Sequence, residues 1–228
     1  MNSDLSDFYD PILRGFGDID SEKLLERLLL DPNWWHSVNT PWEIVLNWSS
    51  LGEVVSKLRA PGVMVNIPGA KSNIWIHPSA KLLPGAYIEG PAIIGPGCIV
   101  GPNCMLREFV FLDTNVIVGQ GAEIKSSAVM KNSFLSHFCY LGHSLLGSDC
   151  SFSAGAITAT RRFDDKTILV SWGGVSRDTG RKKVGAVIGN RVMLGVGTLI
   201  MPGKTIGPDS WIYPGTAINS EIPPGYRP

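Results

Sequence analysis

The sequence has few features that would determine its function by charge or covalent links. Twenty basic and twenty acidic residues cancel over 228 residues, which leaves no overall field for a nucleic acid or a membrane surface. The four cysteines form no CxxC pair, the polar start Met1–Asp4 is unlike a signal peptide, and no apolar run is long enough to cross a bilayer. A soluble cytoplasmic protein with no nucleic-acid or membrane partner is therefore expected.

Glycine and proline, by contrast, are abundant. The 26 glycines and 16 prolines make up about 18% of the chain, against about 12% in average proteins. Both residues disfavour helix interiors, which argues against a helical bundle. Because aliphatic residues are spread through the same region, the glycines and prolines must separate short apolar segments.

The apolar segments repeat with a period of six. The first series of aliphatic positions comprises Ile76, Leu82, Ile88, Ile94, Val100, Leu106, Leu112, Val118, Ile124 and Met130. A mostly small residue follows each by four positions: Ala80, Ala86, Ala92, Cys98, Cys104, Val110, Val116, Ala122, Ala128 and Phe134. The series resumes at Ile188, Leu194, Ile200, Ile206, Ile212 and Ile218.

Neither a strand nor a helix has this period. Six residues per side and three sides per turn predict a parallel β-helix, with rungs about 4.8 Å apart. The aliphatic residues then fill the corners of a triangular core, and Cys98 and Cys104 are small core residues. This all-β domain is expected to span 73–228.

Residues 1–72 have a different pattern and are expected to form a helical appendage and linker. A helical run begins at Asp20 and ends at Pro32, and Thr40-Pro41-Trp42-Glu43 is a helix N-terminus signature. Four tryptophans lie here: Trp34, Trp35, Trp42 and Trp48. We expect them to pack the appendage onto the β-helix or a neighbouring subunit, the alternative being a binding platform.

A regular solenoid has no intrinsic site, so the breaks in the repeat are the candidate functional positions. The phase slips around His137, where Met130 is followed by Leu135 and Leu141, and then by Leu146. The stretch 159–187 is too long and too polar for a coil and is expected to be an extruded loop. Its net charge is +4, which suits a phosphorylated ligand, although many exposed loops are simply charged.

The residues at these breaks resemble a known family. The segments His137–His143 and Gly147–Thr158 are similar to the motifs H-x-x-Y-L-G-D and N-x-G-A-G-T of the acetyltransferase half of bifunctional N-acetylglucosamine-1-phosphate uridylyltransferase. Arg161–Lys166, Thr179–Lys183 and Ile212–Gly215 resemble related sugar-1-phosphate nucleotidylyltransferases with an acetyltransferase tail. The resemblance covers roughly 40–228 and implies a left-handed β-helix, a homotrimer and acetyl-CoA as co-substrate. The G-x-G-T-R loop of a nucleotidyltransferase is missing, so that activity is not expected.

The resemblance also implies the roles of individual residues. It makes His137 the general base on the acceptor amine, a role that suits imidazole at neutral pH. The acceptor-binding positions are Arg107 and Lys125 for its phosphate, Tyr140, and Ser151, where the family has asparagine. On the coenzyme side stand Ala154, whose neighbouring backbone N–H would stabilise the oxyanion, Val196, where the family has serine, and Arg181 and Lys182 for phosphates.

These assignments predict an acetyl-CoA-dependent N-acetyltransferase acting on an amino-sugar 1-phosphate, most simply glucosamine 1-phosphate, for nucleotide-sugar synthesis. His143 stands where the family has aspartate and is a second base, a pantetheine contact or an ordinary surface histidine. One alternative function is a non-catalytic trimerisation or regulatory β-helix module of a nucleotidylyltransferase system. The other is a γ-type carbonic anhydrase, whose three zinc-binding histidines have a spacing that is not reproduced here.

Overall fold

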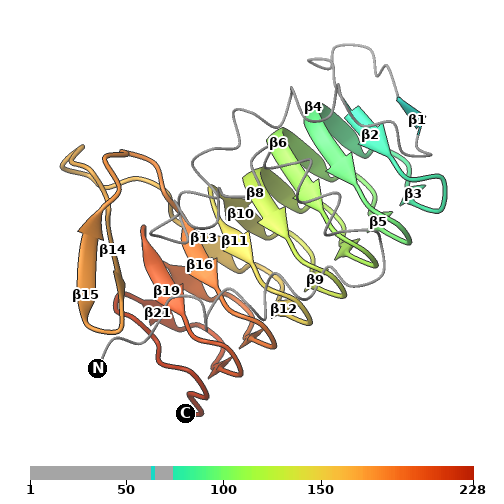
Figure 1. Ribbon diagram of the computed structural model, residues 1–228. Coiled ribbons are helices and arrows are strands. Elements are labelled where there is room, and N and C mark those ends of the chain that lie inside the picture. Colours follow the sequence, from blue (N-terminus) through green and yellow to red (C-terminus); the bar gives the residue numbers. More distant parts are fainter. Residues whose placement is uncertain (1–62, 65–73) are drawn as a thin grey trace, which may run out of the picture.

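The computed structural model describes residues 63–64 and 74–228 (Figure 1). The expected helical appendage and its tryptophans lie outside these residues, apart from β1 (Val63–Met64), which pairs antiparallel with β2 (Ile74–Ile76). The described residues contain no helix, and so none that would span a membrane. The predicted parallel β-helix is confirmed, because nearly every other strand pairs in parallel with the strand one coil away.

The coil has three sides, which we number in chain order. Side 1 consists of β2, β11 (Leu145–Leu146), β16 (Ala186–Ile188) and β19 (Lys204–Ile206), together with the second halves of β4 (Tyr87–Ile94), β6 (Met105–Leu112) and β8 (Glu123–Val129). Side 2 consists of β3 (Lys81–Leu82), β5 (Ile99–Val100), β7 (Ile117–Val118), β9 (Phe134–Leu135), β12 (Ser151–Phe152), β17 (Met193–Leu194) and β20 (Trp211–Ile212). Side 3 consists of the first halves of β4 (Tyr87–Ile94), β6 (Met105–Leu112) and β8 (Glu123–Val129), with β10 (Tyr140–Gly142), β13 (Ile157–Thr158), β18 (Leu199–Ile200) and β21 (Ala217–Ile218).

The corner residues form the core that the hexad pattern predicts. The corners of side 1 are Ile76, Ile94, Leu112, Val129, Leu146, Ile188 and Ile206, all buried. Leu82 is the exception among the predicted corners at 38% exposed, because β3 is the edge strand of side 2. Cys98 and Cys104 are buried core residues, as predicted.

The predicted phase is wrong at the tenth hexad. Leu112 pairs with Val129, so Val129 takes the corner of the core cluster, and Met130 is buried outside that cluster. The small positions shift too: Ser127 and Ser133 take them, and Phe134 is 38% exposed. The first one-residue deletion therefore lies at Ser126, and the second lies at His143, because Leu141 pairs with Ile124 and Leu146 with Val129. Both deletions fall at the bend between sides 3 and 1.

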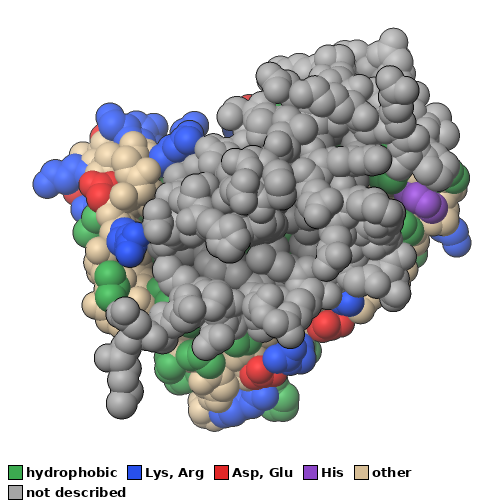
Figure 2. Space-filling view, in the orientation of Figure 1, with side chains coloured by type: hydrophobic (Ala, Val, Ile, Leu, Met, Phe, Trp, Pro, Cys, Tyr) green, Lys and Arg blue, Asp and Glu red, His purple; other side chains and the backbone are tan. Residues whose placement is uncertain are grey.

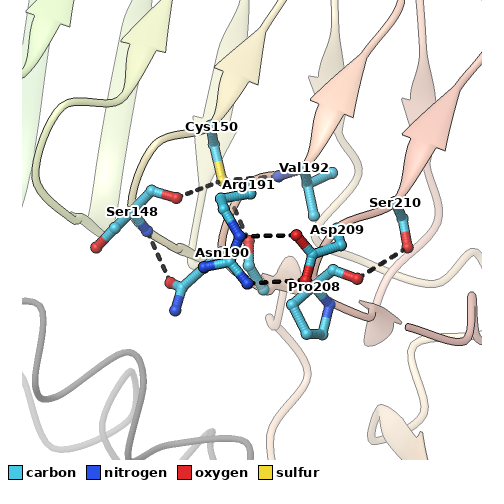
Figure 3. A network of polar contacts seen from close by, with 9 residues as sticks. Ser148, Cys150, Asn190, Arg191, Val192, Pro208, Asp209 and Ser210 are labelled. Carbon is cyan, nitrogen blue, oxygen red and sulfur yellow. Dashed lines mark hydrogen bonds and ion pairs between the residues drawn. The ribbon is translucent and has the colours of Figure 1, made fainter. Parts of the chain in front are cut away.

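The bend between sides 1 and 2 is held by ladders of polar side chains. Asn132 accepts a hydrogen bond from Asn115 at 3.4 Å and donates one to Asp149 at 3.0 Å. Further along, Arg191 forms an ion pair with Asp209 at 2.7 Å (Figure 3). Since equivalent turn positions lie one rung apart, each turn aligns the next and keeps the coils in register.

The insertion between Thr158 and Ala186 contains a β-hairpin where a loop was expected. Its strands, β14 (Leu169–Trp172) and β15 (Val175–Asp178), pair antiparallel and stand beside the C-terminal coils (Figure 1). The hairpin is attached by the Thr205 hydroxyl, which donates to the Ser171 carbonyl at 2.7 Å, and Ile168 and Val170 are buried. Figure 2 shows lysine and arginine side chains gathered over this part of the surface.

Candidate functional site

His137 lies in the bend between sides 2 and 3, and its side chain is exposed. The bend is stacked coil on coil by backbone hydrogen bonds: Gly155 N–H donates to the His137 carbonyl at 3.1 Å, Gly197 N–H to that of Ala154 at 2.9 Å, and Gly215 N–H to that of Val196 at 2.8 Å. His137, Ala154 and Val196 therefore occupy equivalent positions on successive coils, about 4.8 Å apart. The structure brings together the expected base and two expected coenzyme-side residues.

Some backbone donors near His137 are committed. Gly155 N–H is bonded to the His137 carbonyl, and Ala156 N–H donates to the Ser153 carbonyl at 3.1 Å. Among the hydrogen bonds of residues 63–64 and 74–228, the N–H groups of His137, Ser153 and Ala154 donate to no acceptor. The Ala154 N–H is thus one of the donors of this bend that remain for a ligand oxygen.

Arg107 and Lys125 form a second group at the bend between sides 3 and 1. They are register partners on β6 and β8, one coil apart. Each cation is paired with a carboxylate: Arg107 with Glu123 at 2.5 Å and Lys125 with Glu108 at 3.4 Å. Sequence reasoning missed both glutamates, although their alternation with the two cations is visible in the sequence.

Tyr140 connects the two groups. It begins β10, the strand that runs from the His137 bend to the bend of Lys125. A Cβ on Gly142 would come within 2.4 Å of the Tyr140 hydroxyl. The Tyr140 ring therefore lies along β10 towards Gly142, which is the register partner of Lys125. Burial, together with Glu123, raises the Tyr140 pKa, which keeps the phenol neutral.

The remaining predicted residues do not join these groups in the described residues of one chain. Ser151 lies on side 2, paired in register with Phe134 and Met193. Arg181 and Lys182 lie on the exposed return segment of the insertion, where Lys182 forms an ion pair with Asp165 at 2.5 Å. Arg161 pairs with the same Asp165 at 2.8 Å, so part of the predicted positive charge is neutralised within the insertion.

His143 is half-buried at the bend of Lys125. The backbone N–H of His143 donates to the Lys125 carbonyl at 2.8 Å, and the His143 carbonyl accepts a hydrogen bond from the Gly185 N–H at 2.9 Å. Burial, then Lys125 and Lys183, lower the His143 pKa to about 4, against a smaller opposing effect of Glu108. The imidazole is therefore neutral at pH 7 and close enough to Lys125, Lys183 and Glu108 to be affected by their charges.

Within the described part of the chain, no three His, Cys, Asp or Glu side chains lie together in a way that could hold a metal ion. The four cysteines are buried and unpaired, and burial raises the pKa of Cys98, Cys139 and Cys150 to about 12.

The chain resembles known proteins over most of its length. The family described as the GMPPB C-terminal domain matches residues 88–171. A bifunctional sugar-1-phosphate nucleotidylyltransferase/acetyltransferase of Sulfurisphaera tokodaii is 32% identical over 232 residues, covering 97% of this chain and 58% of that protein. The bifunctional protein GlmU of Methanococcus maripaludis is 36% identical over 190 residues, covering 83% of this chain and 46% of that protein.

A solved structure of a hexapeptide transferase family protein from Anaplasma phagocytophilum aligns with a TM-score of 0.45 and 15% identity, covering 60% of this chain and 72% of that one. A likeness this distant says nothing about the site. The chain spans about half the length of the curated relatives it matches. Together, the sequence relatives and the hexad-built coil show a hexapeptide-repeat β-helix domain related to GlmU and to the bifunctional sugar-1-phosphate nucleotidylyltransferase/acetyltransferases.

Proposed function

We propose that this chain is an acetyl-CoA-dependent N-acetyltransferase that acts on an amino-sugar 1-phosphate, most simply glucosamine 1-phosphate. The observation that carries the proposal is the stacked bend of His137, Ala154 and Val196, linked through Tyr140 to Arg107 and Lys125. A base, an unused backbone donor and a cationic pair are the groups that acyl transfer to a phosphorylated amine requires. Relatives named as acetyltransferases support the same reaction.

In the proposed reaction, the acceptor nitrogen attacks the thioester carbonyl of acetyl-CoA, and His137 takes the proton that the nitrogen loses. The Ala154 N–H donates to the oxyanion of the tetrahedral intermediate. The C–S bond then breaks, coenzyme A leaves as a thiolate and the proton passes from His137 to that sulfur. Nitrogen gains the acetyl group, so atoms and charge balance.

The acceptor is oriented by the residues of side 3. Arg107 and Lys125 hold its phosphate in place of Glu123 and Glu108, because a phosphate dianion forms stronger charge-assisted hydrogen bonds than a carboxylate. Tyr140 contacts the sugar between phosphate and amine. Ser151, on side 2, reaches the acceptor of a neighbouring subunit.

The proposed coenzyme path follows the bend of His137 towards Val196, which is 56% exposed, and ends at Arg181 and Lys182. The proposed assembly is a cytoplasmic homotrimer. Its support is the exposed column on side 2, in which Ile117, Phe134, Met193 and Trp211 are apolar and Ser151 is the polar member between Phe134 and Met193. Charge reversal of Arg181 and Lys182 tests the coenzyme assignment, since unchanged acetyl-CoA affinity would contradict it.

Release of the coenzyme A thiol tests the activity. The full chain is assayed with acetyl-CoA and a panel of amino sugars with and without the 1-phosphate, as wild type, His137→Ala and His77→Ala. His77 is a matched control, because it lies on the first coil and bonds to Ser79. We expect turnover of a phosphorylated amine by the wild type. The rate should fall by about 10²–10⁴-fold in His137→Ala and should be unchanged in His77→Ala. No turnover with any amine, or full activity in His137→Ala, would contradict the proposal.

A second function is a non-catalytic trimerisation or regulatory module of a nucleotidylyltransferase system. The observation that favours it is the ion pairing of both Arg107 and Lys125, which gives these cations a structural role without any ligand. It predicts that His137 is dispensable, so the same assay distinguishes the two.

A further inference from the structure

A row of basic residues crosses the bend between sides 3 and 1. Arg107 and Lys125 are register partners, and Lys125 is the register partner of Gly142, which precedes His143. The Gly185 N–H bonds to the His143 carbonyl at 2.9 Å, so the returning insertion brings Lys183 to the same bend. We call Arg107, Lys125, His143 and Lys183 the basic row.

The backbone fixes this arrangement. His143 has a φ of +47°, which falls where the coil is one residue short, and its N–H and carbonyl are bonded to Lys125 and Gly185. Ala186 N–H donates to the Ser144 hydroxyl at 2.9 Å and holds the returning strand in place. The insertion therefore joins the row at a defined position.

The row has an incomplete charge balance. Arg107, Lys125 and Lys183 carry three positive charges, and Glu123 and Glu108 supply two negative ones. His143 is neutral, because burial and the two lysines beside it disfavour its charged form more than Glu108 favours it. One positive charge remains at a half-buried bend.

We propose that Lys125, His143 and Lys183 bind the phosphate of the acceptor, and that His143 becomes protonated when the phosphate is bound. The inference rests on the proposed function for the identity of the ligand. A phosphate dianion changes the net charge of the row from one positive to one negative, and a proton on His143 restores neutrality. The imidazolium also gains a charge-assisted hydrogen bond that compensates for its burial.

His143 and the insertion would then both bind the phosphate of the acceptor. Lys183 comes from the insertion, so the phosphate links the insertion to the coils of Arg107 and Lys125. His143, which is neutral in the free protein and charged in the proposed complex, is then a specificity-determining residue for a dianionic acceptor, distinct in role from His137.

The test follows the imidazole directly. The pH titration of the His143 imidazole proton is recorded by NMR on the full chain, without and with saturating sulfate, a tetrahedral oxyanion that, unlike inorganic phosphate, is still a dianion near pH 4, and His143→Asn assigns the resonance. Asparagine suits the position because it tolerates a positive φ. We expect the midpoint to lie near pH 4 without sulfate and to move clearly upward with it. A midpoint that sulfate does not move would overturn the inference, and this wild-type result stands even if the variant does not fold.

Phosphate affinity gives a second, independent readout. Calorimetric binding of inorganic phosphate should weaken several-fold in Lys183→Ala and not in Lys166→Ala, which removes the same charge from another exposed position of the insertion. Equal affinity in Lys183→Ala and wild type would remove Lys183 from the site and overturn the proposal. Neither experiment contains acetyl-CoA, so loss of acetyl transfer with intact phosphate binding would contradict only the proposed function.

Discussion

The Thr158 hydroxyl replaces a backbone acceptor at the point where the insertion leaves the coil. Thr158 occupies a corner of side 3, where the neighbouring coils have Leu141 and Ile200, and is fully buried. Its Oγ1 accepts a hydrogen bond from the Gly142 N–H at 2.8 Å. β13 pairs with β10 only at Tyr140 and Ile157, because the chain then departs into the insertion. Thr158→Val would leave the Gly142 N–H buried without a partner.

The expected cost follows from two opposing effects. An unsatisfied buried N–H costs about 1–3 kcal/mol, and the added methyl group recovers about 0.8 kcal/mol. The net destabilisation is about 0.2–2.2 kcal/mol, which lowers the melting temperature by up to about 9 °C for a chain of this size. Gly142 lies between Tyr140 and His143, so the loss falls within the candidate site.

Calorimetry and hydrogen exchange measure the two consequences separately. Thr158→Val should lower the melting temperature and increase exchange of the Gly142 amide. Thr158→Ser keeps the acceptor and should keep the Gly142 amide protected, although it loses a methyl group. A Thr158→Val protein as stable as wild type, with a protected Gly142 amide, would refute the reasoning.

Three further predictions follow from the stacked coils. Gly147→Ala should cost about 1–3 kcal/mol in unfolding free energy, because its Cβ would lie 2.6 Å from the Gly189 backbone; chemical denaturation measures the loss, and a variant as stable as wild type would contradict the stacking. The native protein should not react with a thiol reagent at pH 8, since all four cysteines are buried and burial raises the pKa of Cys98, Cys139 and Cys150 to about 12; rapid labelling before unfolding would show that the core is open. Arg191→Ala should change unfolding free energy by less than about 1 kcal/mol, because its ion pair with Asp209 is exposed; a larger loss would mean that the turn ladder depends on it.

The sequence was sufficient to predict the parallel β-helix, because the hexad repeat gives the position of each residue in the coil. It failed at Met130 for a simple reason. Val129 and Met130 are both aliphatic, so a one-residue deletion nearby leaves either able to fill the corner. Only the pairing of Leu112 with Val129 decides between them. The same shift moves the first deletion from between Met130 and Leu135 to Ser126, while the second stays between Leu141 and Leu146, at His143.

The candidate site was predictable only in part. The recurring turns place His137, Ala154 and Val196 on one bend, and the period of 18 aligns Arg107 with Lys125. The role of Thr158 and the approach of Lys183 to His143 depend on where the insertion leaves and rejoins the coil, which no repeat encodes. The hairpin within 159–187 was missed for the same reason, since Leu169–Asp178 is short and partly polar.

The most direct test of the account is detection of the acetylated product itself. Glucosamine 1-phosphate and acetyl-CoA labelled in the acetyl carbonyl are incubated with wild type, His137→Gln and His77→Gln, and the amide carbonyl is followed by NMR. The account predicts an amide signal that grows with wild type and His77→Gln and is nearly absent with His137→Gln. An amide that forms equally fast with His137→Gln, or no amide with the wild-type protein, would contradict it.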